Sequence, residues 1–302
     1  MSKKPKVGMW SGLTAVTAVL TAGAIVGTTV AFHYTTTVNN YLDADTYKII
    51  KGDSDEDTEY FKSDFTSDEE RESYEAELCA QVEAEGAALL KNDNNALPLA
   101  SGAKVSLFGH GSVDLMYGGT GSGSVDTSKA PNFKQALEDQ GIQVNSTLWD
   151  LYSSDDMMKN YSRITPAAIS DTLEANTQYA VNEAPWSKLS SAESSFADYG
   201  DAAIVVFSRS GGEGADLPSG ENGTNDSWIK GQEGDGNYLA LSAEEKELLQ
   251  NLKTLKDNGT FKKIIVLINS SNAIEMDFLN PEICGEDYGI DSAMWIGEVL
   301  PS

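Results

Sequence analysis

Short, uninterrupted apolar segments that alternate with helical segments constrain this chain's fold more than any other feature. They lie at residues 105–109, 202–207, 263–269 and 292–297. Ser242 and Glu245 have the spacing of a capping box, which predicts a helix that buries Leu248, Leu249, Leu252 and Leu255. Strands that are apolar throughout are buried on both faces. The pattern therefore predicts an α/β fold with a mostly parallel sheet sandwiched by helices.

Three further helices are predicted outside these strands. Ser67 and Glu70 form a second capping box, which predicts a helix to about residue 90 with an apolar stripe of Tyr74, Leu78, Val82 and Leu89. A helix is expected at residues 133–140. Another is expected to begin at Pro166, because proline favours the first helical position.

The N-terminal part of the chain predicts a membrane anchor. Residues 1–6 contain three lysines, and residues 7–32 form an uncharged run long enough to cross a bilayer. The basic flank predicts a cytoplasmic tail at 1–6, a single-pass signal anchor at 7–32, an acidic stalk at 33–66 and an extracytoplasmic domain at 67–302. The alternatives are a cleaved signal peptide and a buried core helix.

Net charge narrows the classes of partner. The formal charge is −26 and the pI is near 4.2, so the surface repels nucleic acid and a neutral partner such as a sugar fits better. Residues 53–57 imitate the start of a calcium loop, but Thr58 stands where a glycine is needed, so no metal is expected. Cys79 and Cys284 are expected to be small buried side chains, with pairing as the alternative.

The segment 201–218 contains the candidate catalytic group. An apolar strand ends in a turn that places Glu213 between two glycines. Ligands of open α/β sheets bind outside the carboxyl ends of strands, so Glu213 is a candidate general acid/base. A polar surface loop is the alternative, and three other acids of the same loop are alternative proton donors: Glu221, Glu233 and Asp235. Trp186 and Trp228 either stack on a sugar or pack within the domain.

Two glycine-rich loops do not fit phosphate-binding motifs. The turn Gly109-His110-Gly111 has Asp114 where a dinucleotide fingerprint needs its third glycine. The loop 118–124 is not followed by the lysine of a Walker motif. No cofactor is therefore expected, and the loop is predicted to offer hydroxyl and N–H groups to a neutral ligand, or to bind nothing. His110 has no second histidine or cysteine nearby and is expected to line its turn.

The ordered motifs LLKNDNNALPL, KVSLFG, GTGSG, DAAIVVFSRSGGEGADLP, KKIIVLINSSNAIEMDFL and AMWIGE resemble the α/β-sandwich domain of glycoside hydrolase family 3. The resemblance extends over about residues 75–301. It implies a β-glucosidase-like, retaining enzyme whose substrate is an oligosaccharide or β-glucoside. In that family a (β/α)8 barrel supplies the nucleophile and the sandwich domain supplies the acid/base glutamate.

The resemblance assigns roles to five positions. Glu213 lies at the position of the acid/base, Arg209 and Asp216 would shape the pocket, and Gly121 and Ser122 would contact substrate. The barrel usually comes first, so the order here is similar to an inverted subgroup, with the barrel expected downstream of Ser302. The isolated chain is accordingly expected to be an inactive part of the enzyme. The alternative is a noncatalytic carbohydrate-binding or structural module at the cell surface.

Overall fold

The computed structural model describes residues 7–42, 63–118, 125, 127–128, 130–164, 180–211 and 238–299. Contacts divide the chain into two compact units, residues 1–63 and 64–302. The first unit contains helix α1 (Val7–His33) and the short helix α2 (Thr35–Tyr41). Within α1, the segment Trp10–His33 has a mean hydropathy of 1.8 and none of it is buried. It is long and apolar enough to span a membrane and is not a core helix of the described structure.

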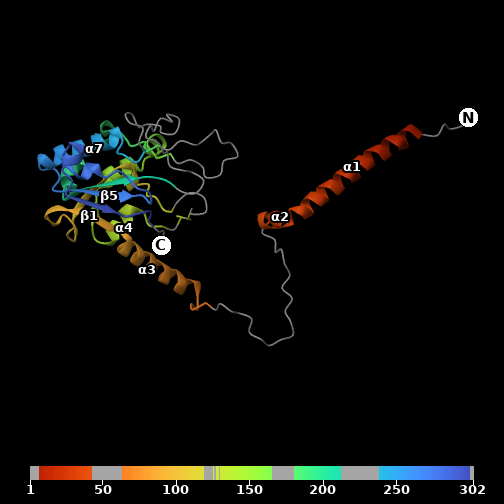
Figure 1. Ribbon diagram of the computed structural model, residues 1–302, viewed down its shortest axis with the longest axis horizontal. Helices are drawn as coiled ribbons and strands as arrows, with labels where there is room; N and C mark the ends of the chain where they lie inside the picture. Colours follow the sequence, from red (N-terminus) through yellow and green to blue (C-terminus); the bar gives the residue numbers. More distant parts are fainter. Residues whose placement is uncertain are drawn as a thin grey trace, which may run out of the picture. The chain divides into compact units, whose positions relative to one another are not determined.

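The second unit is built on one sheet with the strand order β1-β6-β5-β4-β2-β3 (Figure 1). Adjacent strands are parallel except β1, which pairs antiparallel with β6 at one edge. The strands are β1 (Ala88–Asn92), β2 (Lys104–Phe108), β3 (Gln143–Val144), β4 (Ala202–Ser208), β5 (Ile264–Asn269) and β6 (Ser292–Trp295). The predicted mostly parallel α/β sheet is therefore confirmed.

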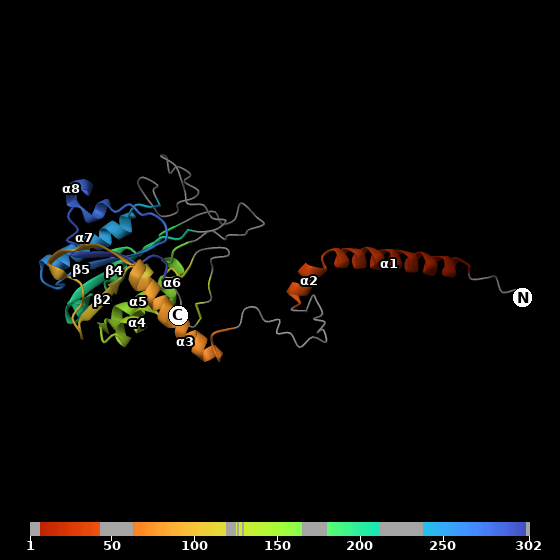
Figure 2. The same ribbon diagram turned by 60° about the horizontal axis from the view of Figure 1, so that its bottom comes forward.

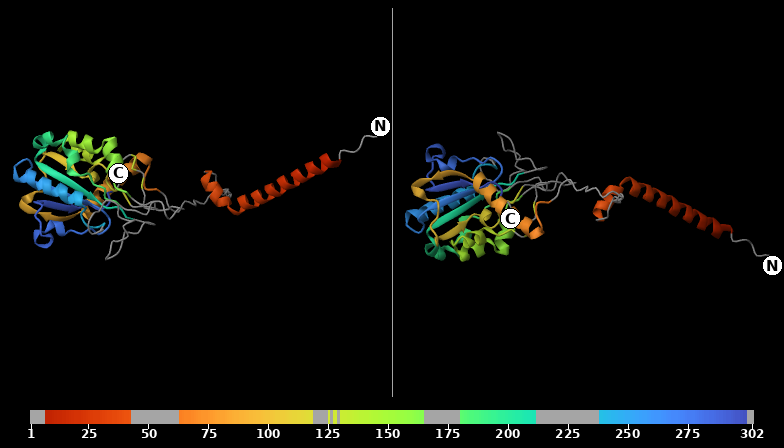
Figure 3. Two further views of the ribbon diagram at one scale, coloured as in Figure 1. Left: turned by 90° about the horizontal axis from the view of Figure 1, so that it is seen from above. Right: turned by 90° about the horizontal axis from the view of Figure 1, so that it is seen from below.

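Helices cover both faces of this sheet. On one face, β4 residues Ala203, Val205 and Phe207 join a cluster with buried leucines of α7 (Ala243–Asp257) and with α5 (Ser146–Tyr152). On the other face, Ala202 and Ile204 join a cluster flanked by α4 (Phe133–Asp139). Figure 2 shows α5 beside β2 and α7 beside β5, with α4 next to α5 and α8 (Pro281–Cys284) next to α7. Figure 3 shows the sheet from two opposite sides.

Helix α7 follows from its sequence signals. The Ser242 hydroxyl accepts a hydrogen bond from the Glu245 N–H, and the Ser242 N–H donates to the Glu245 carboxylate at 2.8 Å, so the predicted capping box is confirmed. Leu248, Leu249 and Leu252 are buried, and Leu255 packs against the same cluster. Full burial of one such leucine contributes about 1.5–3 kcal/mol.

The helix predicted to run to residue 90 ends earlier. Helix α3 (Asp68–Gly86) has the predicted Ser67 cap, but the residues after Gly86 form the edge strand β1. Leu89 therefore belongs to a strand, where it pairs with Met294 of β6. Pairing with β6 outweighs the helical spacing of this apolar residue. The predicted stripe on α3 is not buried either, because Tyr74, Leu78 and Val82 are all exposed.

The remaining described elements are short. They are helix α6 (Asp155–Asn160) and the 3-10 helices η1 (Asp93–Asn95), η2 (His110–Ser112), η4 (Trp186–Leu189), η5 (Glu193–Tyr199) and η6 (Asp277–Leu279). The helix expected at Pro166 lies outside the described residues. Cys79 and Cys284 are both free and only partly buried.

Candidate active site at the carboxyl edge of the sheet

The turn after β2 is shaped by its contact with β4. Gly109 has a φ of 83°, and a Cβ atom there would lie 2.7 Å from the Val206 carbonyl oxygen. A Cβ atom on Gly111 would lie 2.5 Å from the Ser208 hydroxyl oxygen. Both glycines are therefore required for close packing between the turn and β4. This explains the Gly-His-Gly sequence without any phosphate ligand.

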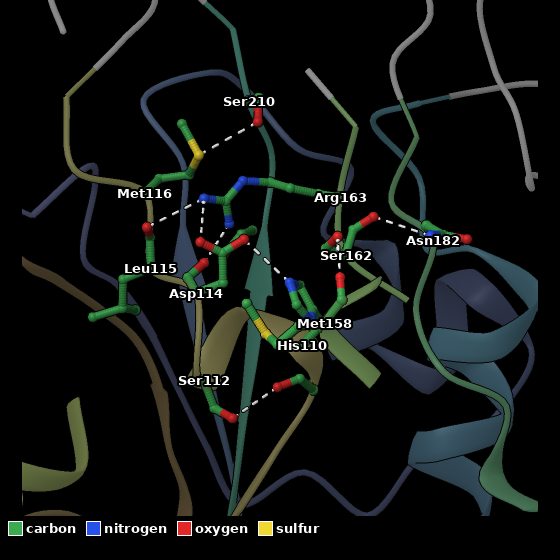
Figure 4. A network of polar contacts seen from close by, with 12 residues as sticks. His110, Ser112, Asp114, Leu115, Met116, Met158, Ser162, Arg163, Asn182 and Ser210 are labelled. Carbon is green, nitrogen blue, oxygen red and sulfur yellow. Dashed lines mark hydrogen bonds and ion pairs between the residues drawn. The ribbon is translucent and has the colours of Figure 1, made fainter. Parts of the chain in front are cut away.

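A polar network follows this turn (Figure 4). The buried His110 ring places Nε2 3.1 Å from Oδ2 of Asp114, and Arg163 Nη2 donates to Oδ1 of the same carboxylate at 3.1 Å. Arg163 also donates to the main-chain oxygens of Asp114 and Leu115. Burial acts to raise the pKa of the Asp114 carboxyl, but His110 and Arg163 outweigh it and leave the pKa below its usual value. Asp114 is therefore an ionised anchor of the loop.

A cavity of about 400 Å³ opens beside this network. It is lined by Ser112, Val113, Asp114, Leu115, Met116, Tyr117, Gly118, Thr127, Ala130, Asn132, Phe133 and Arg163. Its size lies within the range of small-molecule sites, and its lining combines two aromatic rings with hydroxyl, amide and charged groups. The cavity lies after β2, at the carboxyl edge of the sheet.

Asn269, the last residue of β5, joins the loop after β2 to two neighbouring strand ends. Its Oδ1 accepts from the Met116 N–H at 2.6 Å and from the Ser208 hydroxyl at 3.0 Å. Its Nδ2 donates to the carbonyl oxygens of Met116 and Gly297. The side chain thus fixes one wall of the cavity. We did not predict this role, although a buried asparagine at the end of an apolar strand is a usable signal.

The structure shows Arg209 as a buried anchor, whereas the family resemblance implies that it shapes the substrate pocket. The side chain is fully buried, and its guanidinium binds both oxygens of the Glu245 carboxylate at 2.8 Å. Its other three N–H groups donate to the carbonyl oxygens of Ser208, Tyr238 and Ala240. Because all five donors are satisfied within the protein, the side chain has no N–H group left for a sugar.

Arg209 instead connects the described residues on the two sides of the segment 212–237. It lies three residues before that segment and binds the carbonyl groups of Tyr238, the first residue after the segment, and Ala240, the third. The Tyr238 hydroxyl adds a second connection, since it accepts from the Ser210 N–H at 2.7 Å and donates to the Ser210 carbonyl. The described residues that flank the segment containing Glu213 are therefore joined to each other at the carboxyl edge of the sheet.

Glu183 is a buried acid that we did not predict. It is 5% exposed, and its two oxygens accept from the N–H groups of His110 at 2.7 Å and Ala184 at 3.0 Å. Burial, together with the nearby Glu245, raises its pKa to about 8. A protonated carboxyl is what acid catalysis needs, but both oxygens are already occupied inside the protein. Glu183 is therefore placed to hold the turn after β2 and not to contact a substrate.

Several predicted site residues lie outside the described residues: Glu213, Asp216, Gly121, Ser122, Glu221, Trp228, Glu233 and Asp235. Of the others, His110 lines its turn as expected. Trp186 packs against Phe108 and Phe196, with ring centroids 6.3 and 6.1 Å apart, which confirms its packing role. Within the described part of the chain, no group of three or more His, Cys, Asp or Glu residues could hold a metal ion.

Comparison with known proteins identifies the family of the α/β unit. The family model of the glycosyl hydrolase family 3 C-terminal domain matches residues 87–285. Beta-glucosidase A of Butyrivibrio fibrisolvens is 31% identical over 216 residues, which cover 66% of this chain and 23% of that protein. A beta-glucosidase of Ruminococcus albus is 29% identical over 223 residues, which cover 73% of this chain and 20% of that protein. The chain thus spans less than a quarter of the length of these relatives.

Solved structures show the same fold. A beta-glucosidase of Paenibacillus barengoltzii superimposes with a TM-score of 0.52 and 26% identity, covering 74% of this chain and 21% of that one. Beta-glucosidase 3B of Thermotoga neapolitana gives a TM-score of 0.52 and 23% identity, covering 76% and 28%. Because the family model matches most of the sheet and its helices, the chain belongs to glycosyl hydrolase family 3 and contains that family's C-terminal α/β domain.

Proposed function

We propose that this chain is the α/β part of a membrane-anchored, retaining β-glucosidase, in which Glu213 is the acid/base residue. The observation that supports this most is that Arg209 joins the described residues on the two sides of the segment 212–237 at the carboxyl edge of the sheet. A catalytic carboxyl group must be held in a defined position by the residues around it. The same edge of the sheet also contains the cavity. The family and the relatives named as beta-glucosidases support the reaction class.

The proposed reaction needs two carboxyl groups roughly 5 Å apart. Glu213 donates its proton to the glycosidic oxygen while a carboxylate from a (β/α)8 barrel, expected downstream of Ser302, attacks the anomeric carbon. The alcohol leaves and a glycosyl-enzyme forms. Glu213, now ionised, then takes a proton from the water that hydrolyses this intermediate, and the configuration is retained. We assign Asp216, Gly121 and Ser122 to the substrate pocket by their place in the family motifs.

The membrane assignment is supported by α1 and its basic flank. Residues 7–32 would span the membrane once, with residues 1–6 cytoplasmic and the α/β domain extracytoplasmic. A cleaved signal peptide is the alternative. Membrane fractionation distinguishes them, because an uncleaved anchor stays with the membrane after alkaline washing and a cleaved domain is released.

A noncatalytic carbohydrate-binding module is the second candidate function. The cavity favours it, because the described lining residues all belong to the α/β unit and need no second domain. In this case Glu213 would be inert. Binding of β-glucosides without turnover by the longest product of the coding sequence would support the module over the enzyme.

The experiment that tests the enzyme uses the longest product of the coding sequence and compares the wild type with Glu213→Ala on aryl β-glucosides with good and poor leaving groups. If Glu213 is the acid, the variant loses most activity on the poor leaving groups, because these need protonation to depart. Glu221→Ala, in the same loop, is the matched control. Equal losses on all leaving groups, or a larger effect at Glu221, would contradict the assignment.

A further inference from the structure

The loop after β5 contacts the described residues on both sides of the segment 212–237. On the C-terminal side, the Glu275 N–H donates to the Leu239 carbonyl oxygen at 2.9 Å. On the N-terminal side, the Asn272 side chain packs against Gly211, the last described residue before the segment. This loop therefore joins the two flanks of the segment.

The contact between Asn272 and Gly211 is close. A Cβ atom on Gly211 would lie 2.3 Å from Nδ2 and 2.7 Å from Oδ1 of the Asn272 amide. The amide group therefore lies directly against the main chain of Gly211, and a larger residue at that position would displace it. Gly211 is itself buried. The Asn272 side chain thus restricts the main chain at this point.

The Asn272 amide also has a polar atom that the described part of the chain leaves unpaired. Its Nδ2 atom is buried and has no hydrogen-bond partner among the described residues. A buried donor without a partner destabilises the fold, and such groups are rare in native proteins. An apolar side chain of similar size would avoid this destabilisation. Stability alone therefore does not explain an asparagine here.

The main chain that carries this amide is held in place by its own loop and by β6. The Asn272 N–H donates to the Ser270 hydroxyl at 3.1 Å, and the same hydroxyl donates to the Asn272 carbonyl oxygen at 3.1 Å. The Ser270 carbonyl oxygen accepts from Nε1 of Trp295 at 2.7 Å. Asn272 is therefore supported from the sheet and not from the segment 212–237.

Gly211 lies two residues before Glu213 in the sequence. A chain advances by at most about 3.6 Å per residue, so the Cα atom of Glu213 lies within about 7 Å of the Cα atom of Gly211. A general acid must come within hydrogen-bond reach of the oxygen that it protonates. The position of the main chain at Gly211 therefore limits where the Glu213 carboxyl group can act.

We propose that Asn272 is a positioning residue for proton transfer by Glu213, because its amide fixes the main chain at Gly211. This inference rests on the proposed function. In the step concerned, Glu213 gives its proton to the glycosidic oxygen while the bond between that oxygen and the anomeric carbon breaks. A misplacement of about 1 Å in such a site can reduce the rate about a hundredfold. The reduction falls on substrates whose leaving group must be protonated.

The kinetic test uses the longest product of the coding sequence and compares kcat/KM for aryl β-glucosides with poor and good leaving groups. Asn272→Ala should lower kcat/KM about 10- to 100-fold on the poor leaving groups, because their departure needs the proton of Glu213. On the good leaving groups, which depart without that proton, kcat/KM should change little. A merely structural role of Asn272 would not produce this selectivity.

Ser271→Ala is the matched control. Ser271 lies in the same loop, but its side chain is exposed and its hydroxyl donates to the Glu298 carboxylate at 2.9 Å. This variant should keep the wild-type dependence on the leaving group. An equal effect of Ser271→Ala would overturn the proposal. The same holds if Asn272→Ala lowers kcat/KM by one factor on all substrates, or does not lower it on any.

Glu213→Ala in the same product separates this inference from the proposed function. If Glu213→Ala loses kcat/KM selectively on the poor leaving groups and Asn272→Ala does not, the proposed function stands and only the role of Asn272 is wrong. If Glu213→Ala shows no such selectivity, or if the wild type hydrolyses no glycoside, the assignment of the acid fails and the positioning role fails with it.

Two further measurements use this chain and do not require activity. Asn272→Ala should keep Tm within about 4 °C of the wild type, because it removes an unpaired donor together with a packing contact. Hydrogen exchange of the peptide that contains Ser210 and Gly211 should become faster, because the contact that fixes this main chain is lost. A larger fall in Tm would make Asn272 a structural residue, and unchanged exchange would mean that it does not fix Gly211. Either result would overturn the proposal.

Discussion

Replacing Arg209 with methionine tests whether this residue is a structural anchor. The substitution removes a guanidinium whose five N–H groups are all used and leaves the Glu245 carboxylate buried at 1% exposure. The Ser242 N–H then remains as its described donor. Removing one partner of a buried ion pair lowers the free energy of unfolding by about 3–5 kcal/mol, because the charge of the other partner stays buried without compensation.

This cost should be visible in thermal unfolding of the full chain in detergent. For an α/β unit of this size, 1 kcal/mol shifts Tm by roughly 2–4 °C, so Arg209→Met should lower Tm by roughly 6–20 °C. Glu245→Met in the Arg209→Met background should cost less than the sum of the two single changes, since an apolar pair leaves no unpaired charge.

The surface pair of Lys262 and Asp201 is the control. Its atoms are 2.6 Å apart, but the lysine side chain is 71% exposed, so Lys262→Met should cost less than about 1 kcal/mol. An Arg209→Met variant that unfolds within 1 kcal/mol of Lys262→Met would refute the reasoning. The reasoning would also be refuted if the loss of stability in the Arg209→Met/Glu245→Met double variant equalled the sum of the two single losses, because the two side chains would then not depend on each other.

Three further predictions concern the turn after β2 and its neighbours. Gly111→Ala should lower the free energy of unfolding in urea by about 1–3 kcal/mol, because the new Cβ atom would lie 2.5 Å from the Ser208 hydroxyl oxygen. An unchanged free energy of unfolding would mean that the turn relaxes freely. Asn269→Ala should lower the free energy of unfolding by about 1–3 kcal/mol and expose the Met116 amide to hydrogen exchange, since it removes the acceptor of that N–H. Unchanged protection of the Met116 amide would contradict this. Asp114→Asn should be less stable than the wild type at neutral pH, and the difference should shrink as the pH falls below about 4. The Asp114 carboxyl has a lower pKa in the folded protein than in the unfolded chain, so the ionised group stabilises the fold above the unfolded pKa and this stabilisation is lost as acid protonates it. A difference in free energy of unfolding that does not depend on pH would contradict this.

Strands and capping boxes were predictable because their signals are local. Residues 202–207 are apolar throughout and form the fully buried strand β4, and Ser242 with Glu245 caps α7 as expected. The error at residues 87–90 has a physical cause: an apolar residue at helical spacing is equally suited to an edge strand. Pairing of Leu89 with Met294 joins positions far apart in the sequence, so no local pattern indicates it.

For the candidate site too, only part could be predicted from the sequence. The carboxyl edge of the sheet could be identified in advance, because the carboxyl ends of parallel strands meet at one edge of a sheet. The function of its individual side chains was not predictable. Arg209 looks like a ligand-binding residue in the sequence, yet it is paired with Glu245, which lies 36 residues later. Glu183 could not be recognised from the sequence around it, because its raised pKa arises from burial and from acids on other elements.

Local sequence signals were enough to predict the α/β class, the apolar N-terminal helix, the family and the sheet edge where chemistry is expected. These follow from hydrophobic periodicity, capping signals and ordered motifs, which are properties of neighbouring residues. The tertiary structure decided which polar groups are buried and with what partners. It made Arg209 an anchor, Asn269 a link between strand ends and Glu183 a buried acid, because burial and ion pairing depend on residues that only folding brings together.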